Sequence, residues 1–351
     1  MKKLLAAILS LTLVLTMLAG CTRQVVVVVS PDQDSAAPVE TYVPTEGAVK
    51  TGLSMVTGMS SSKSATADAE GVAQTDIALV AVTVDDNGVI TACAIDAIQA
   101  KIKFNAEGKV VTDLATEFVS KNERGDAYGM RVASSIGKEW NEQAAAFAAY
   151  AVGKTVDELK NMAVTEGGAP ADADLASSVT LYSGNFVSGI EAAVNNATHL
   201  GAQAGDKLAL TSVTTMAKSK DATADAEGQA QAYANVAVVT TNGDTVTSCY
   251  IDAVQATVKF DATGTITSDI TAPAASKNEL GDGYGMRVAS SIGKEWNEQA
   301  AAFAAYVTSK TIDQVVGIAV DDHESPVDAD LAASVTVGIG EFQTLIQKAA
   351  Q

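Results

Sequence analysis

Hydrophobic and polar positions follow a helical period in a 23-residue stretch that occurs twice. The stretch YGMRVASSIGKEWNEQAAAFAAY covers residues 128–150 and returns unchanged over residues 284–306, at a spacing of 156 residues. Read as a helix, it gathers apolar residues on one face at steps of three and four, namely Val132, Ile136, Trp140, Ala144, Phe147 and Ala148. The pattern predicts one amphipathic helix per copy, packed on a core, in a chain that is one domain written twice.

Each copy contains a single tryptophan, Trp140 in the first and Trp296 in the second. A large flat ring of this kind fills a core or stacks on a planar ligand. The sequence alone leaves both uses open.

Strand patterns precede the repeated stretch. Residues 77–84 are rich in β-branched side chains and end at Asp85-Asp86-Asn87-Gly88, where Asn-Gly predicts a type I′ hairpin turn. The returning strand, residues 89–96, continues through residues 97–104 toward another glycine turn, and the second copy repeats both features. Short helices at 156–162 and 312–318, a strand at 177–181 or 334–337, and a terminal helix complete each copy. These elements predict an α+β protein, two tandem copies of an antiparallel sheet packed with helices.

The first 21 residues predict a secretory leader. Lys2 and Lys3 precede an apolar run over residues 4–18, and the last four residues, Leu18-Ala19-Gly20-Cys21, resemble a bacterial lipobox. A retained membrane helix is the alternative, but the run of about 15 apolar residues is shorter than the ~20 that a span needs. The resemblance implies that Cys21 becomes a lipid-carrying N-terminus, which would anchor the chain to the outer side of the cell membrane.

The remaining sequence divides into four segments. Residues 22–51 contain prolines among polar side chains and predict an extended tether. The five valines from Val25 to Val29 have no assigned role, and a short strand is one interpretation of them. Copy one covers residues 52–197, a linker covers 198–206, and copy two covers 207–351. Each copy is long enough to bury a core of its own.

Composition narrows the function. The net charge of -19, from 42 acidic and 23 basic residues, argues against nucleic-acid partners, whose phosphates need a basic surface. Cys93 and Cys249 are equivalent residues amid apolar neighbours and are interpreted as core, with a disulfide between the two copies as the alternative. The only histidines, His199 and His323, have no counterpart in the other copy, so we predict neither a histidine triad nor a metal site.

Three features together resemble a known family. They are the lipobox, the V-T-V-x-x-N-G-x-I pattern over residues 82–90, and the stretch carrying Tyr128-Gly129-Met130 and Trp140. With these features the chain is similar to the surface lipoproteins with FMN-binding domains, including tandem members of extracellular electron-transfer systems and the "major membrane immunogen" type. The resemblance covers most of residues 52–351. It implies FMN as cofactor, and a flavin transferase and redox proteins as partners.

The resemblance also implies attachment sites. In flavinylated members FMN is joined through its phosphate to a threonine hydroxyl in a motif of the form D-x-x-S/T-G-A-T. On this chain, Asp172 and Asp328 take the aspartate place, and Ser178 and Ser334 take the acceptor place. The match is partial, because leucine replaces the usual Ser/Thr, alanine replaces glycine, and serine replaces threonine. The alternative interpretation is a polar loop that enters a strand.

Two functions therefore follow from the sequence. The first is a surface-tethered lipoprotein with two FMN-binding-like domains that relays electrons outside the cytoplasmic membrane and needs no catalytic residue of its own. The second is a cofactor-free surface lipoprotein, a ligand- or protein-binding scaffold or antigen, in which duplication raises the effective concentration for a partner.

Overall fold

The computed structural model describes residues 25–26, 41–42 and 47–351. Val25–Val26 (β1) pairs antiparallel with Thr41–Tyr42 (β2). Cys21 and the rest of the predicted leader lie outside the described residues, as does most of the predicted tether. From residue 47 onward the chain belongs to one compact unit. Among the described residues, no helix is long and apolar enough to cross a membrane.

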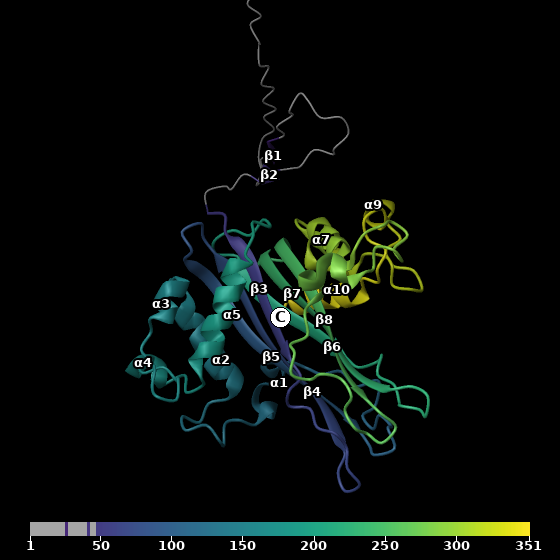
Figure 1. The fold of residues 1–351 in the computed structure, drawn as a ribbon. Coiled ribbons are helices and arrows are strands. Elements are labelled where there is room, and N and C mark those ends of the chain that lie inside the picture. The colour runs from purple at the N-terminus through teal and green to yellow at the C-terminus, as the bar shows by residue number, and fades with distance from the viewer. Residues whose placement is uncertain (1–24, 27–40, 43–46) are drawn as a thin grey trace, which may run out of the picture. The chain divides into compact units, whose positions relative to one another are not determined.

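Copy one contains a three-stranded antiparallel sheet in the order β3-β4-β5, followed by helices (Figure 1). Its elements are β3 (Lys50–Gly58), β4 (Gly71–Val84), β5 (Ile90–Phe104), α1 (Lys121–Arg124), the 3-10 helix η1 (Gly125–Tyr128), α2 (Trp140–Ala151), α3 (Val156–Lys160), α4 (Ala173–Ala176) and α5 (Ser183–Asn195).

Copy two repeats this plan in the order β6-β7-β8. Its elements are β6 (Lys207–Thr215), β7 (Gly228–Asn242), β8 (Thr245–Phe260), α6 (Lys277–Leu280), η2 (Gly281–Tyr284), α7 (Trp296–Val307), α8 (Ile312–Val316), α9 (Ala329–Ala332) and α10 (Gly340–Lys348). The predicted class is confirmed: the chain is α+β, with two antiparallel sheets packed with helices. The first strand of each copy, β3 and β6, was not among the predicted elements.

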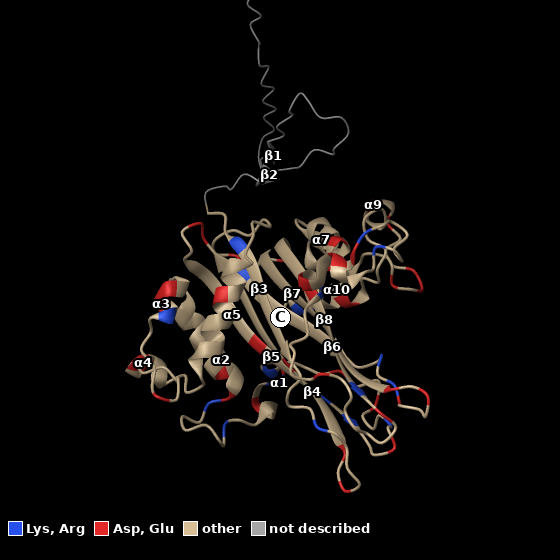
Figure 2. Ribbon diagram, viewed as in Figure 1, with Lys and Arg blue, Asp and Glu red and all other residues tan. Residues whose placement is uncertain are grey.

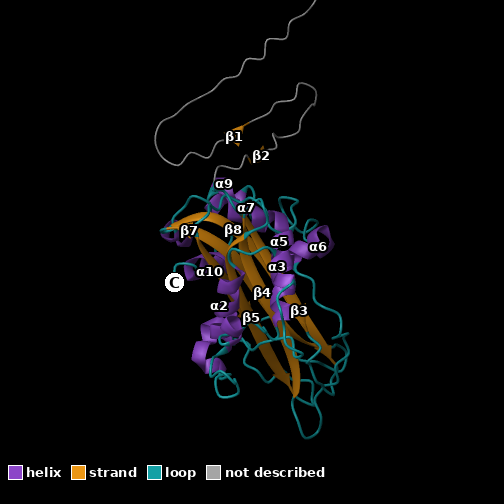
Figure 3. Cartoon of the chain, turned by 90° about the vertical axis from the view of Figure 1, so that its left-hand side faces the viewer, coloured by secondary structure: helices purple, strands orange, loops and turns teal. Residues whose placement is uncertain are grey.

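Burial along β4 explains how the sheets are stacked. Every residue from 79 to 84 is buried. Since successive side chains point to opposite sides of a sheet, this part of β4 is covered on both faces. Val80 and Val82 face a core formed with the helices of copy one, whereas Leu79 and Ala81 face residues of the second sheet. Copy two has its own core of helices on sheet. The layers therefore run helices, sheet, sheet, helices, with the long strands in the middle (Figures 1 and 3).

Both predicted core cysteines are free thiols. Cys249 is 3% exposed within the core of copy two, and Cys93 is half-buried against the core of copy one. Burial raises the pKa of both thiols to about 12. The interpretation of Cys249 as a small core residue is confirmed.

The turn between β4 and β5 lies where the sequence predicts it, but its type differs. A type I′ turn needs positive φ at both central residues. Among the described residues other than glycine, only Ser309 and Glu324 have positive φ, so Asn87 does not meet that requirement. Gly88 alone supplies the positive φ, at +80°, while the Asp85 carboxylate accepts the N–H groups of Asn87 and Val89.

The two copies meet through reciprocal contacts. The rings of Phe104 and Phe260, which occupy the same place in their copies, stack with centroids 4.2 Å apart and planes 5° apart. Gly108 accepts a hydrogen bond from Ala222 N–H at 2.7 Å, and its counterpart Gly264 accepts one from Ala65 N–H at 2.8 Å. A Cβ on Gly108 would come within 2.8 Å of Ala222 Cβ, so this close approach requires glycine. The junction thus has an approximate two-fold symmetry.

The prediction of a helix over residues 128–150 is wrong for its first half. α2 begins only at Trp140, residues 130–138 form turns, and Val132 is 96% exposed instead of facing a core. The cause is Glu139, which is 1% exposed and whose carboxylate accepts the N–H groups of Met130 and Arg131, each at 2.8 Å. These polar bonds fold the chain back before the helix begins. Copy two is the same, with Val288 95% exposed.

Candidate ligand site

The aspartates of the partial flavin motif cap short helices. Asp172 precedes α4, and its Oδ1 accepts the N–H groups of Asp174 and Leu175, each at 3.1 Å. Asp328 precedes α9 and accepts the N–H of Leu331 at 3.0 Å. Both carboxylates are exposed, and capping of a helix N-terminus accounts for an aspartate at these positions.

The serines of the motif lie directly after the same helices and are half-buried. Ser178 Oγ accepts a hydrogen bond from Lys138 Nζ at 3.0 Å, and its N–H bonds to Leu175 O at 2.9 Å. Ser334 makes the same backbone bond, to Leu331 O. The strands predicted over residues 177–181 and 334–337 are therefore wrong, since turns that close the short helices occupy these positions. Aspartate and serine lie at opposite ends of one short segment in each copy.

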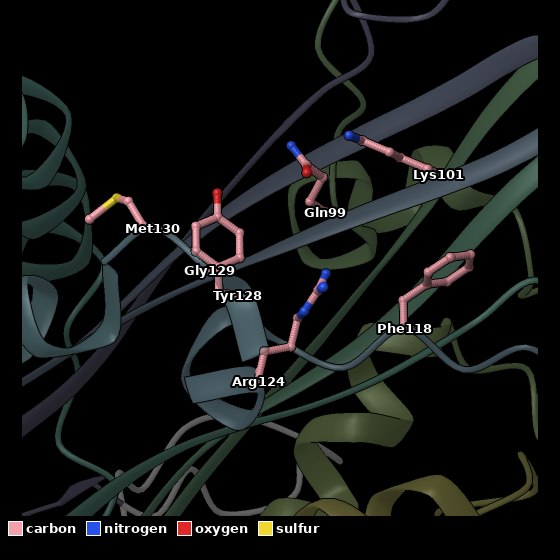
Figure 4. Close-up of a pocket in the computed structure, with 7 residues that line it drawn as sticks. All are labelled: Gln99, Lys101, Phe118, Arg124, Tyr128, Gly129 and Met130. Atoms are coloured by element: carbon pink, nitrogen blue, oxygen red, sulfur yellow. The ribbon is translucent and has the colours of Figure 1, made fainter. Parts of the chain in front are cut away.

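A cavity lies elsewhere in copy one, between β5 and the α1–η1 segment (Figure 4). Its volume is about 590 Å³, within the ~300–1,000 Å³ typical of ligand pockets. It is an open cleft lined by cationic, aromatic, polar and thioether side chains and one glycine, namely Gln99, Lys101, Phe118, Arg124, Tyr128, Gly129 and Met130. None of the four motif residues lines it.

Each wall of the cleft has a local cause. Gln99 and Lys101 project from the same face of β5 because they are two residues apart on a strand. Arg124 ends α1 and Tyr128 ends η1, and both lie opposite the strand residues in Figure 4. α1 is fixed by a capping box in which the Ser120 hydroxyl accepts the Glu123 N–H and the Glu123 carboxylate accepts the Ser120 N–H.

A buried carboxylate joins α1 to the sheet. Asp96 of β5 is 5% exposed and accepts the N–H groups of Asn122 and Ala97 at 3.1 and 2.7 Å. Burial raises the pKa of this carboxyl. Asn122 in turn donates to Ile95 O at 2.9 Å. These bonds hold the helix that carries Arg124 against the strand that carries Lys101.

The cleft is electropositive in an acidic protein. Acidic side chains are spread over both copies (Figure 2), yet the described part of the chain places no carboxylate within ion-pair distance of Lys101 or Arg124. The Arg124 guanidinium lies 5.8 Å from the centroid of the Tyr128 ring. Two carboxylates accept hydrogen bonds from lining residues: Asp76 from the amide of Gln99, and Glu139 from the N–H of Met130. The cleft can therefore hold an anionic group beside an aromatic surface.

Tyr128, which lines the cleft, also contacts an ammonium group together with Trp140. Lys121 Nζ lies 4.7 Å from the Tyr128 centroid and 4.8 Å from the Trp140 centroid. Trp140 itself is 8% exposed and meets Phe186 edge to face at 6.2 Å. The open question about the tryptophan is thereby answered in favour of core packing, since the ring does not line the cleft.

Copy two contains a tighter version of this arrangement. Lys277 Nζ lies 4.7, 4.7 and 4.6 Å from the rings of Tyr233, Tyr284 and Trp296, and donates to the Tyr233 hydroxyl at 2.9 Å. Burial lowers the pKa of Lys277 to about 8. Tyr233 has no equivalent in copy one, where Asp76 occupies its position.

Sequence reasoning missed Gln99, Lys101 and Arg124. They come from separate elements, and a single basic residue on a strand or a short helix does not form a sequence motif that indicates a binding site. The one available signal was the start of the identical stretch, Tyr128-Gly129-Met130, which forms one wall of the cleft.

Comparison of the chain with protein-family models, with curated proteins and with solved structures finds no match. Among the described residues, no group of three or more His, Cys, Asp or Glu side chains is placed to hold a metal ion.

Proposed function

We propose that this chain is a lipid-anchored binding protein that holds FMN outside the cytoplasmic membrane and serves as an electron carrier. The observation that carries the proposal is the cleft of copy one, which combines two cationic side chains with an aromatic wall in a strongly acidic protein. The anchor at Cys21 and the redox partners rest on the family resemblance alone.

The lining residues fit the chemistry of a flavin mononucleotide. Lys101 and Arg124 can donate charge-assisted hydrogen bonds to a phosphate, and the fork of a guanidinium suits a phosphate better than a single ammonium does. Tyr128 and Phe118 offer ring surfaces to a planar heterocycle, and Met130 offers a polarizable side chain. FMN, when bound, supplies one- and two-electron redox chemistry, while these residues bind and orient it.

Covalent attachment at Ser178 and Ser334 is a separate part of the proposal. Asp172 and Asp328 would then contribute to recognition by a flavin transferase. The two serines lie on the turns after α4 and α9 and not in the cleft. Covalent attachment at a serine and non-covalent binding in the cleft can therefore be distinguished by experiment. Flavin held in the cleft leaves the protein on denaturation, whereas flavin joined to a serine remains in the intact mass.

Titration of the purified full chain with FMN, followed by quenching of flavin fluorescence, tests the cleft. We expect saturable binding that weakens by about tenfold or more in the double variant Lys101→Thr with Arg124→Leu, because each charged hydrogen bond contributes about 1.5–3 kcal/mol. Lys103→Thr is the matched control: Lys103 lies on the same strand, pairs with Glu70 at 2.9 Å and does not line the cleft. Equal affinities in all three proteins would refute the cleft as the site.

A cofactor-free scaffold is the second candidate, favoured by one observation. Val132 and Val288 are almost fully exposed on identical loops of the two copies, and an exposed apolar side chain in a fixed loop suits a protein partner better than solvent. Absence of FMN binding in solution together with absence of flavin in protein purified from its native membrane would favour this candidate.

A further inference from the structure

The two copies share one part of the cleft and differ in another. Tyr128, Gly129 and Met130 recur as Tyr284, Gly285 and Met286, and Gln99 recurs as Gln255. We call these four residues of each copy the floor. The other three positions, which we call the rim, are replaced in copy two: Lys101 by Thr257, Phe118 by Ala274 and Arg124 by Leu280. All positive charge of the cleft belongs to the rim of copy one.

The backbone beneath the rim is the same in both copies. Gly125, which follows Arg124, has φ 49° and ψ -127°, and Gly281, which follows Leu280, has φ 49° and ψ -125°. Gly129 and Gly285 agree to within 3° in both angles. The difference between the copies is therefore one of side chains on an unchanged frame.

Stability does not account for the two cations of the rim, although Phe118, the third rim residue, packs against two of the cores. Lys101 and Arg124 are exposed, and no ion pair with either is found in the described part of the chain. Exposed charges of this kind contribute little to folding even when they are paired. In copy two, Thr257 Oγ1 accepts a hydrogen bond from Gln231 Nε2 at 2.9 Å, and Leu280 is 42% exposed. Two exposed cations beside the Tyr128 ring therefore suit a binding role.

The residues around the floor also differ between the two copies on the side of the sheet. Tyr233, on the strand next to Gln255, covers the Lys277 ammonium, and the Tyr284 hydroxyl donates to Gln255 Oε1 at 3.4 Å. In copy one the equivalent glutamine, Gln99, donates instead to Asp76 at 2.9 Å. The floor glutamine of copy two is thus bonded to the floor tyrosine, whereas that of copy one is bonded to Asp76 outside the floor.

We propose that the copies discriminate ligands by charge. Copy one takes an aromatic ligand that bears a terminal dianion such as a phosphate monoester, read by Lys101 and Arg124, and copy two does not take that ligand. Resting on the proposed function, this predicts one FMN per chain held without a covalent bond, although the domain is present twice.

Two ligand pairs that differ only in the phosphate test the proposal on the full chain: FMN with riboflavin, and phenyl phosphate with phenol. Calorimetric titration of the wild type should give one site for FMN and an affinity for riboflavin at least about tenfold weaker, which corresponds to loss of one charged hydrogen bond. Lys101→Thr with Arg124→Leu should abolish this preference. The reverse exchange in copy two, Thr257→Lys with Leu280→Arg, should raise the number of FMN sites from one to two.

The outcomes separate the two proposals. Two equivalent FMN sites in the wild type, or a preference for the phosphate that survives the double substitution in copy one, overturns charge discrimination and leaves FMN binding intact. One phenyl phosphate site that depends on Lys101 and Arg124, without any binding of FMN, upholds charge discrimination and refutes the flavin. Failure to bind either phosphate ligand refutes both. Thermal unfolding of each variant checks for a folding defect. The variant of copy one should match the wild type because Lys101 and Arg124 are exposed, whereas Thr257→Lys also removes the hydrogen bond from Gln231.

Discussion

The 23 residues that are identical in the two copies divide at Glu139 into an exposed loop and a buried helix. In the helix, the identical residues Trp140, Ala144 and Phe147 pack against the sheet and α5, so the same core explains the same residues twice. In the loop, Arg131 and Val132 are exposed, and the same core cannot explain why they too are unchanged. The comparison shows that a continuous stretch of identical sequence needs two explanations: packing in the core accounts for the helix but not for the loop.

The loop keeps its shape through polar bonds instead of burial of apolar side chains. The Glu139 carboxylate accepts two backbone N–H groups, and the Glu139 N–H donates to Glu142 Oε2 at 2.7 Å. Arg131 binds Gly137 O at 3.0 Å and Asp126 at 2.7 Å. Copy two repeats these bonds through Glu295 and Arg287. A loop held in this way presents its exposed residues in a fixed arrangement.

Loss of the large ring at the start of the helix should have the largest effect. Trp140→Ala leaves a cavity between α2 and α5, and we expect the free energy of unfolding to fall by about 3–5 kcal/mol. Trp296→Ala is the matched variant in copy two and should behave alike, because Trp296 meets Phe342 as Trp140 meets Phe186. Denaturation by urea, followed by circular dichroism, measures both. A change near zero would mean that the helix half is not held by its core.

Removal of the loop's central charge should have an intermediate effect. Glu139→Gln keeps the size of the side chain but converts one carboxylate oxygen into an amide donor, which faces a backbone N–H. We expect a loss of about 1–3 kcal/mol, the range for a buried polar group whose hydrogen bond is removed. Glu107→Gln, on an exposed turn, is the control and should have little effect. Equal losses in the two variants would show that Glu139 does not organise the loop.

The exposed valine should matter least for stability. Val132→Ser and Val288→Ser should change the free energy of unfolding by less than about 0.5 kcal/mol, as is usual for surface positions. Val179→Ser provides the contrast, because Val179 is fully buried and the new hydroxyl would enter the core. If Val132→Ser destabilised the fold as much as Val179→Ser, the loop would be part of the core after all.

The same division shows what the sequence could predict. Alternating and continuous apolar runs identified the hairpin strands, and the helical period of residues 140–150 identified α2, because burial of one face causes both patterns. The loop was missed because Val132 and Ile136 continue that helical period by chance, whereas the Glu139 bonds that fold it leave no periodic trace. The shared core between the sheets was also missed, although the continuous apolar run over residues 77–82 is typical of a strand buried on both faces.

The candidate site was largely beyond sequence reasoning. Lys101 and Arg124 lie 23 positions apart in the sequence and line one cleft, where Asp96 bonds α1 to β5. Ser178 and Asp172 were selected by resemblance to a motif, and the structure gives each of them a local hydrogen-bonding role. A pattern of residue types does not reveal which exposed side chains share a cleft.

The stacked pair Phe104 and Phe260 bears on the history of the chain. The two halves of a homodimer with this junction would have to be identical, because one gene encodes both and every substitution appears in each. A single chain is free of that constraint, and the halves of this chain differ, with Lys101 and Arg124 in one and Thr257 and Leu280 in the other. Duplication followed by fusion thus provides a route by which a symmetric ancestor becomes a protein with two unequal halves and no change of architecture.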